Sequence, residues 1–145
     1  MCVVELGAGT GSVTKYLLDI LPRDSKLISI EINPSLARKL AQSISDPRLE
    51  LIYGDASKLR IYLKERHIEK ADYIVSSLPF GSLLKKTRWA IYDEINNCLK
   101  PGGVYTQFQY LLTNLFEIKN RFVISNIGFE ARNFPPAFVY TCKLR

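Results

Sequence analysis

Three glycines on alternate positions follow an apolar stretch near the start of the chain. Residues 3–12 read V-V-E-L-G-A-G-T-G-S, so Gly7, Gly9 and Gly11 come directly after a candidate buried parallel strand. Glycine lets the backbone turn tightly and approach a ligand more closely than any Cβ would allow. Apolar residues then recur at helical spacing at Val13, Tyr16, Leu17, Ile20 and Leu21. The pattern predicts a strand, a turn and a helix whose positive end points at a bound ligand, although a tight turn that binds nothing has the same pattern.

The spacing of these glycines distinguishes between classes of cofactor. A dinucleotide fingerprint, G-x-G-x-x-G, would place its third glycine at position 12, where this chain has Ser12. With Glu5 ahead of the turn, the segment E-x-G-x-G-x-G instead resembles the first motif of class I S-adenosylmethionine-dependent methyltransferases, in which the turn holds the methionine end of the cofactor. The resemblance implies that the cofactor, S-adenosyl-L-methionine, is contacted by Glu5, Gly7, Ala8, Gly9 and Gly11.

Acidic residues follow two later candidate strands. Glu31 comes after residues 27–30 and twenty residues past Gly11, where a carboxylate can accept both hydroxyls of a ribose. Asp55 follows residues 49–53 in the segment G-D-A, and in the resembling family this Asp lies beside the adenine amino group. Asp55 is equally suited to cap a helix beginning near Ser57, and both roles can hold together. Further cofactor contacts are predicted at Ile32, Gly54, Ala56 and Ser76.

The order of the predicted elements indicates an α/β fold. Five strand–helix units precede two strands, at 129–134 and 137–142, that flank Pro135 and Pro136. We expect a doubly wound, mostly parallel seven-stranded sheet with a C-terminal antiparallel hairpin, the Rossmann-like methyltransferase fold, with the last strand beside the fifth. The more alternating strand 49–53 should lie near an edge, and the fifth strand should span 104–108. The last helix is marked by Leu115, Phe116, Phe122 and Val123.

Length and composition fit one globular domain over residues 1–145. The chain is 47% hydrophobic, yet no apolar run approaches the roughly 20 residues that span a bilayer, and no signal peptide is evident at the N-terminus. We therefore expect a cytoplasmic protein. Cys2, Cys98 and Cys142 are odd in number, far apart and without nearby histidines, so we expect reduced thiols and no metal site.

A formal net charge of +6 favours anionic partners, which nucleic acid, an anionic membrane surface or small acidic ligands could each supply. The densest basic groups are Lys85, Lys86 and Arg88, and Lys119 and Arg121. Solvated helix faces would account for the same residues. The charge alone therefore leaves the partner open.

The segment S-L-P-F at Ser77 to Phe80 bears on the methyl acceptor. Ribosomal RNA adenine dimethyltransferases carry N-L-P-Y, whose Asn accepts a hydrogen bond from the adenine amine and whose ring stacks on the flipped base. The segment S-x-L-P-F, with Q-F-x-Y at Gln107 to Tyr110 and N-F-P-P-A at Asn133 to Ala137, is more similar to bacterial phospholipid N-methyltransferases, which methylate phosphatidylethanolamine. These enzymes carry an N-terminal segment ahead of the first strand, whereas this chain begins almost on it. We expect either that this segment is missing or that the chain is not active alone.

The resemblance implies a lipid amine substrate at an anionic membrane surface, approached peripherally from the inner side. RNA is the alternative substrate, and a cofactor-binding fragment without catalysis is a third hypothesis. The oligomeric state is left undetermined.

The implied chemistry is in-line displacement by a neutral amine in a dry cavity, which demands no potent acid or base. The residues expected at this site are Ser77, Leu78, Pro79, Phe80 and Tyr110, with Tyr110 or a water held by Ser77 receiving the amine's proton. Phe80, Tyr110 and Phe134 should converge there, each ring contributing about 0.5–2 kcal/mol by cation–π attraction. Core packing is an equal competitor for Phe134. His67 should lie at the opposite sheet edge, in a surface role.

Overall fold

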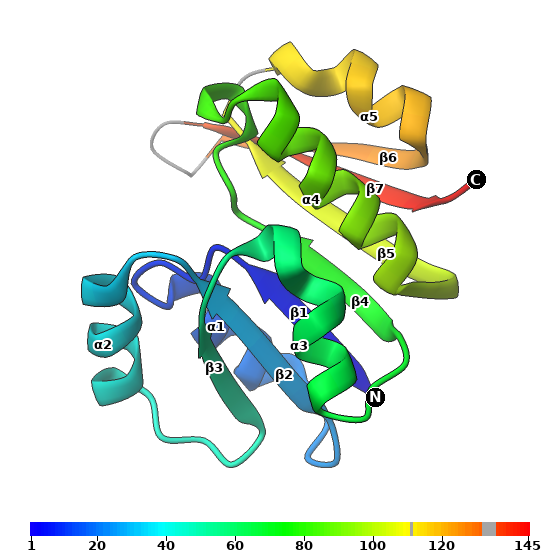
Figure 1. Ribbon diagram of the computed structural model, residues 1–145. Helices are drawn as coiled ribbons and strands as arrows, with labels where there is room; N and C mark the ends of the chain where they lie inside the picture. Colours follow the sequence, from blue (N-terminus) through cyan, green and yellow to red (C-terminus); the bar gives the residue numbers. More distant parts are fainter. Residues whose placement is uncertain (111, 132–135) are drawn as a thin grey trace.

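The strands of this chain form one seven-stranded mixed sheet in the computed structural model, which describes residues 1–110, 112–131 and 136–145 (Figure 1). The order across the sheet is β3-β2-β1-β4-β5-β7-β6, with β7 antiparallel between β5 and β6 and the others parallel. This arrangement confirms the predicted fold. The strands are β1 (Cys2–Leu6), β2 (Lys26–Glu31), β3 (Leu49–Tyr53), β4 (Ala71–Ser76), β5 (Leu99–Gln109), β6 (Phe122–Glu130) and β7 (Ala137–Leu144).

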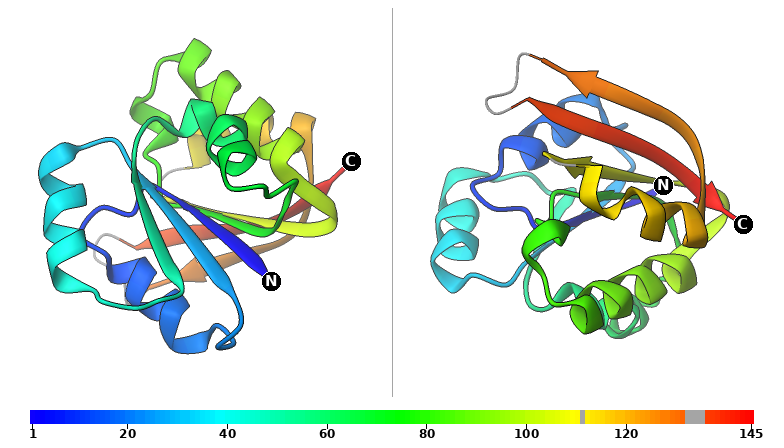
Figure 2. Two further views of the ribbon diagram at one scale, coloured as in Figure 1. Left: turned by 60° about the horizontal axis from the view of Figure 1, so that its bottom comes forward. Right: turned by 90° about the horizontal axis from the view of Figure 1, so that it is seen from above.

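Helices cover both faces of the sheet. Figure 2 shows α1 on one face and α3, α4 and α5 on the other. The elements are α1 (Ser12–Ile20), α2 (Pro34–Ser43), α3 (Leu59–Glu65), α4 (Lys85–Cys98) and α5 (Leu115–Arg121), with short 3₁₀ turns η1 (Ala56–Lys58), η2 (Phe80–Ser82) and η3 (Leu112–Asn114). Because side chains alternate along a strand, Val3 and Leu27 pack towards α1, whereas Val4 and Ile28 belong to the larger core under α3 and α4.

Local signals explain where several elements begin. Asn33 caps α2, since its Oδ1 accepts from the backbone N–H of Ser35 at 2.9 Å and of Leu36 at 3.2 Å, and Pro34 occupies the first helical position. The alternating strand β3 lies at the sheet edge, as its pattern predicts, and most of its residues are partly exposed. Because β1 to β5 are parallel, their carboxyl ends all lie at one edge of the sheet, where the predicted site residues lie.

The first helix presents a different face from the predicted one. Tyr16 and Ile20 are 63% and 59% exposed, whereas Thr14, Leu17 and Leu18 are buried. The helix is rotated because Thr14 must reach a buried acid on β1, a polar contact that an apolar periodicity does not register. The apolar spacing of 13–21 therefore predicted the helix correctly and its inner face only in part.

The last helix and the fifth strand have other boundaries than predicted. Helix α5 ends at Arg121, and Phe122 and Val123 belong to β6, where Phe122 pairs with Leu144. The ring of Phe122 is 1% exposed and lies 5.0 Å from that of Tyr105, so burial on the sheet decides its conformation. Strand β5 begins at Leu99 rather than at 104, because Leu99 already pairs with Ala71. The hairpin strand predicted at 129–134 is the β6 strand, and Phe134 and Pro135 lie outside the described residues.

The three cysteines are free thiols, as predicted. Cys98 and Cys142 are buried, and burial raises the pKa of each to about 12. Both thiols therefore stay protonated at neutral pH and behave as small apolar side chains.

Replacing Phe122 by alanine should destabilise the protein by about 3–5 kcal/mol, because a fully buried ring between Tyr92 and Tyr105 leaves a cavity. Urea unfolding measures the change. The matched variant Phe116→Ala removes a ring that is 75% exposed and should change the free energy of unfolding by less than about 0.5 kcal/mol. Equal losses in the two variants would contradict the placement of Phe122.

Candidate active site

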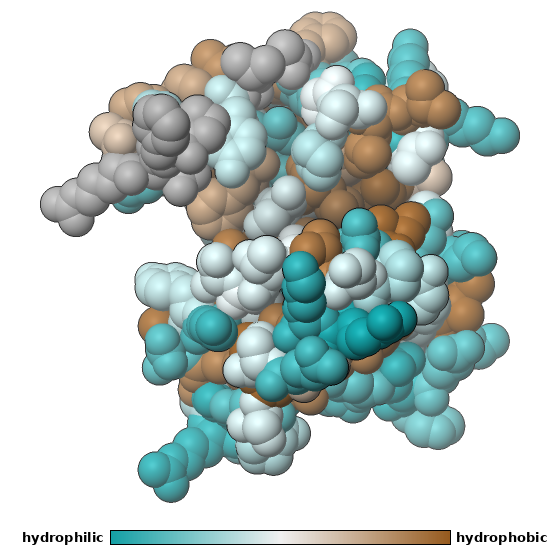
Figure 3. Space-filling view, turned by 90° about the vertical axis from the view of Figure 1, so that its left-hand side faces the viewer, coloured by the Kyte–Doolittle hydropathy of each residue, from teal (hydrophilic) through white to brown (hydrophobic). Residues whose placement is uncertain are grey.

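A pocket of about 410 Å³ lies at the carboxyl edge of the parallel strands. Figure 3 faces this edge and shows a hollow, with hydrophobic surface inside it, between the two halves of the molecule. Predicted residues that line the pocket are Gly7, Gly9, Glu31, Ile32, Gly54, Asp55, Ala56, Ser77, Leu78 and Pro79. Ligands of doubly wound sheets bind at this position.

The glycines of the first turn divide between the pocket and the packing of helices. Gly9 has φ +55°, and a Cβ built on it would meet no atom within 4 Å, so its backbone faces open space at the pocket. Gly11 has φ +89° and caps α1, and a Cβ there would collide with the side chain of Leu40 on α2. Gly11 is not among the residues that line the pocket, and its lack of a side chain lets α2 pack against the turn.

Glu31 ends β2 with its carboxylate held at the pocket. Its Oε2 accepts from the N–H of Gly9 at 2.7 Å, and its Oε1 accepts from the N–H of Asn33 at 2.8 Å. The side chain thereby ties the glycine turn to the start of α2. Each carboxylate oxygen has a second lone pair, so the group can still accept hydroxyl hydrogens from a ligand.

Glu5 does not line the pocket, so the structure does not bring it to the position predicted for a cofactor contact. It is 0% exposed, and its Oε2 accepts from the hydroxyls of Thr14 at 2.7 Å and Ser29 at 2.5 Å. Burial raises the pKa of Glu5, and these two hydrogen bonds oppose the rise. The residue joins β1 to α1 and β2 behind the turn and shapes the site from inside the core.

Asp55 caps the 3₁₀ turn η1 and also lines the pocket. Its Oδ1 accepts from the N–H of Ser57 at 2.9 Å, which confirms the predicted capping role. Its own N–H donates to the hydroxyl of Tyr62 at 3.1 Å, and that hydroxyl also abuts Gly54 so closely that no Cβ would fit there. The carboxylate is thus held rigidly at the pocket wall, where the adenine contact stays a prediction.

The segment after β4 delivers Ser77, Leu78 and Pro79 to the pocket. The N–H of Ser77 donates to the carbonyl of Leu6 at 2.9 Å, which fixes the backbone, but its buried Oγ has no hydrogen-bond partner among the described residues. A buried hydroxyl without a partner is costly, so this oxygen is suited to bind a ligand. Among the features of the pocket, this oxygen gives the most direct indication of where a polar group of a ligand would bind.

Four other predicted residues do not reach the pocket. Phe80 is 0% exposed, with its ring 4.7 Å from that of Tyr92, because η2 turns the side chain into the core. Tyr110 is 57% exposed after the end of β5 and is not part of the described lining. Ala8 and Ser76 are buried, and Ser76 Oγ accepts from the N–H of Leu78 at 3.3 Å. His67 is exposed, in the loop that precedes β4.

Further side chains from α2, β2 and α4 complete the pocket, and the sequence pattern did not predict that they line it. Leu83, just before α4, and Thr87 and Ile91, on α4, are spaced by four, and Ile30 on β2 and Leu36 on α2 also line the pocket. The i, i+4, i+8 spacing was visible in the sequence. What it did not show was that this stripe faces a pocket rather than the core.

Arg88 belongs to the scaffold of the site, unlike the solvent-exposed lysines beside it. Its guanidinium binds Glu117 on α5 through two hydrogen bonds of 2.7 Å and donates to the carbonyl of Leu83 at 2.8 Å. The hydrogen bond from Arg88 lowers the pKa of Glu117. A bidentate pair of this kind is strong and planar, so it clamps the loop before α4 to α5 and leaves Arg88 unavailable to a surface partner.

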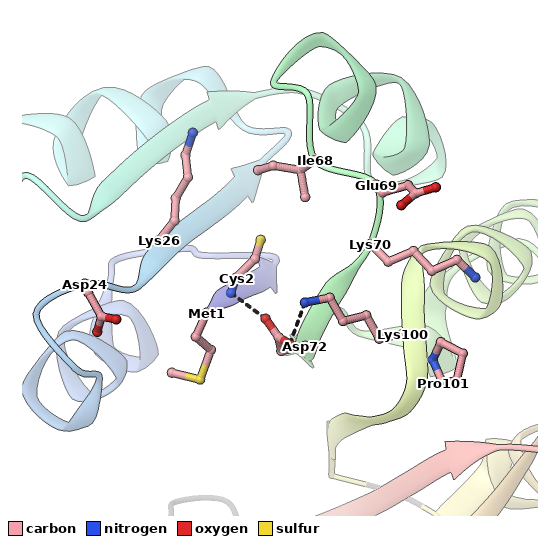
Figure 4. Close-up of a pocket in the computed structure, with 10 residues that line it drawn as sticks. All are labelled: Met1, Cys2, Asp24, Lys26, Ile68, Glu69, Lys70, Asp72, Lys100 and Pro101. Carbon is pink, nitrogen blue, oxygen red and sulfur yellow. Dashed lines mark hydrogen bonds and ion pairs between the residues drawn. The ribbon is translucent and has the colours of Figure 1, made fainter.

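A larger hollow of about 740 Å³ lies at the opposite, amino edge of the sheet (Figure 4). At its centre the Asp72 carboxylate accepts from the N–H of Cys2 and from Lys100 Nζ, each at 2.7 Å. The hydrogen bond from Lys100 lowers the pKa of Asp72. Because this acid is already satisfied and the hollow lies away from the strand ends where ligands bind, we assign the site to the smaller pocket.

In residues 1–110, 112–131 and 136–145 there is no group of three or more His, Cys, Asp or Glu side chains placed to hold a metal ion. Within the same residues no helix has both the length and the apolarity that crossing a bilayer requires.

The stability of the protein should fall more steeply with rising pH than that of Glu5→Gln. Burial raises the pKa of Glu5 above its ordinary value of 4.5. The contribution of protonated Glu5 to the free energy of unfolding is therefore complete below pH 4.5 and is lost as the pH rises through the raised pKa. Glutamine cannot ionise, and its amide oxygen can still accept from Ser29 and Thr14. Urea unfolding from about pH 4 to about pH 8 measures both profiles. Parallel profiles would show that ionisation of Glu5 does not lower the free energy of unfolding, which would contradict the prediction.

Comparisons with known proteins identify the family. Residues 3–103 match the family described as "Methyltransferase domain". The ornithine lipid N-methyltransferase of Singulisphaera acidiphila is 34% identical over 143 residues, which cover 97% of this chain and 74% of the relative. Ribosomal RNA small subunit methyltransferase A of Campylobacter hominis is 33% identical over 97 residues, or 64% of this chain and 34% of the relative.

Solved structures support the fold independently. The N-methyltransferase NodS of Bradyrhizobium japonicum, determined with S-adenosyl-L-homocysteine, superposes with a TM-score of 0.79 at 14% identity, covering 99% of this chain and 77% of NodS. A methyltransferase from Anabaena variabilis also gives a TM-score of 0.79, at 15% identity, over 100% of this chain and 77% of that one.

The pocket fits the cofactor of this family. Gly9 leaves open space beside the turn, the carboxylate of Glu31 has lone pairs left for hydroxyls, and Asp55 lines the same pocket. The sheet order, the pocket at the carboxyl edge and the similarity along almost the whole chain agree. The chain therefore belongs to the S-adenosylmethionine-dependent methyltransferases and is an N-methyltransferase.

Proposed function

We propose that this protein methylates the primary amine of a lipid head group, with phosphatidylethanolamine as the expected acceptor. The observation that carries the proposal is the buried Ser77 Oγ, which has no partner among the described residues and lines the pocket beside Leu78 and Pro79. One hydroxyl is enough to orient an aliphatic amine. The 34% identity to an ornithine lipid N-methyltransferase supports a lipid amine, since that enzyme's name also specifies one.

The chain's own residues act by binding, orienting and excluding water. S-adenosylmethionine supplies a methyl group made electrophilic by its sulfonium. Gly7, Gly9 and Glu31 would hold its amino-acid and ribose portions, and Asp55 would accept from its adenine amine. Leu83, Thr87 and Ile91 form an apolar wall that keeps water from the amine, and Ser77 Oγ would accept one of its hydrogens.

The titratable side chains of the described lining do not supply a free general base. The carboxylates of Glu31 and Asp55 both accept hydrogen bonds from backbone N–H groups, and Tyr110 lies outside the lining. The amine therefore has to enter neutral or pass its proton to water held at Ser77 Oγ. Such a reaction depends on position and desolvation, which this pocket provides.

The runner-up, methylation of adenine in RNA, has support in the 33% identity to ribosomal RNA small subunit methyltransferase A. Two features count against it. Serine stands where the adenine enzymes carry asparagine, and the ring of Phe80, which would have to stack on a flipped base, is 0% exposed and packed on Tyr92. A cofactor-binding fragment without catalysis is the remaining hypothesis.

Glu31→Ala should weaken the binding of S-adenosyl-L-homocysteine by more than about tenfold, because a charged acceptor of two hydroxyls is lost. Isothermal titration calorimetry measures the affinity. The control Glu65→Ala removes an exposed carboxylate at the end of α3 and should leave affinity unchanged. Unchanged affinity in Glu31→Ala, with the fold intact by circular dichroism, would remove the assignment.

Ser77→Ala should lower the turnover of phosphatidylethanolamine by about tenfold or more and spare cofactor affinity, because only the orientation of the amine is lost. Ser77→Asn restores the N-L-P-aromatic pattern, so a lipid enzyme should lose activity to the bulkier amide. Transfer of label from the cofactor to vesicles and to structured RNA measures both. Methylation of RNA by the wild type, with none of phosphatidylethanolamine, would make the adenine acceptor correct.

A further inference from the structure

Two large apolar side chains stand exposed where the first turn of α4 meets α5. Leu84 is 78% exposed and Phe116 is 75% exposed. The N–H of Arg88 donates to the carbonyl of Leu84, and the Arg88 guanidinium binds Glu117, which follows Phe116. The contacts of Arg88 thus hold the segment that carries Leu84 next to the helix that carries Phe116.

Trp89 occupies the same surface with cations over its ring. It is 41% exposed, with Lys85 Nζ 4.4 Å and the guanidinium carbon of Arg121 5.4 Å from the ring centroid. Tryptophan with neighbouring lysines is typical of the interface between hydrocarbon and water, because the ring is apolar and the ammonium groups extend to the head groups.

The charge of this surface is complementary to an anionic one. Its acids are neutralised within the protein, since Glu117 pairs with Arg88 and Asp93 pairs with Arg121. Lys85, Lys86 and Lys119 are exposed. The surface thus presents apolar tips surrounded by positive charge.

The same turn of α4 forms the wall of the pocket. Leu83 and Thr87 line the pocket, whereas Leu84 and Lys85, next in sequence, are exposed. We propose that Leu84, Lys85, Lys86, Trp89, Phe116 and Lys119 form a docking surface for an anionic lipid bilayer, with Leu84 and Phe116 entering the bilayer. This inference rests on the proposed lipid acceptor: docking brings the pocket wall to the bilayer, so that a head-group amine enters without the lipid leaving it.

Flotation with vesicles of equal phosphatidylglycerol and phosphatidylethanolamine tests the docking surface. The double variant Leu84→Ser/Phe116→Ser should bind at least tenfold more weakly than the wild type. The matched control Tyr16→Ser/Ile20→Ser removes two apolar side chains that are 63% and 59% exposed on α1, on the other face of the sheet, and should bind within twofold. Unchanged binding of the first variant, or an equal loss in the control, would overturn the proposal.

A charge-matched pair tests the electrostatic part. Lys85→Gln/Lys86→Gln and Lys15→Gln/Lys39→Gln lower the net charge equally, and all four lysines are exposed. Only the first pair should weaken binding and reduce its dependence on ionic strength. Equal effects of the two pairs would show that net charge alone attracts the protein to the vesicles, which would overturn the proposal of a defined docking surface. Loss of structured-RNA binding with vesicle binding retained would make the surface a nucleic-acid face and also overturns it.

Methylation of monomeric, short-chain phosphatidylethanolamine separates docking from catalysis. The Leu84→Ser/Phe116→Ser variant should methylate this monomer at the wild-type rate and vesicle lipid at least tenfold more slowly. Equal loss on both substrates would place the two residues in the pocket's function and overturn docking. If the wild type methylates neither form, the proposed acceptor is wrong, while vesicle binding still decides the docking surface.

Discussion

The fully buried carboxylate of Glu5 is the contact on which the geometry of the site depends. It joins three elements, because it lies on β1 and accepts from Ser29 on β2 and Thr14 on α1. Burial of a carboxyl group is costly unless hydrogen bonds replace its hydration, and here two hydroxyls donate to Oε2, whereas Oε1 has no hydrogen-bond partner among the described residues. The glycine turn runs between β1 and α1, so its two ends are fixed by one side chain.

Two further acids repeat this arrangement closer to solvent, with a different result. Glu31 ends β2 and accepts from the N–H of Gly9, in the turn after β1, and of Asn33, whereas Asp55 follows β3 and accepts from the N–H of Ser57. Because they lie at the pocket, their remaining lone pairs face a ligand site rather than the core. The depth of each acid therefore decides its role. Glu5, in the core, only positions the glycine turn, whereas Glu31, at the pocket, positions the turn and can also bind a ligand.

The sequence was sufficient for features that depend on local pattern. Strand order, the edge position of β3, the cap at Asn33 and the place of Glu31, Asp55 and Ser77 at one sheet edge all follow from periodicity and from where strands end. The failures involve the direction of a side chain. Glu5 and Phe80 lie beside pocket residues in sequence but turn into the core, and Arg88 differs from Lys85 because Glu117, 29 residues later, binds it.

Helix α4 combines three surfaces that no single periodicity describes. Thr87 and Ile91 face the pocket, Tyr92 and Ile95 are buried in the core, and Lys85 and Trp89 face solvent. Arg88 binds both the Leu83 carbonyl and Glu117, so it connects this wall of the pocket to α5. A partner that binds the outer surface of α4 would therefore contact the same helix that carries Thr87 and Ile91 at the pocket. In the proposed function, binding at that surface would bring the pocket close to the partner.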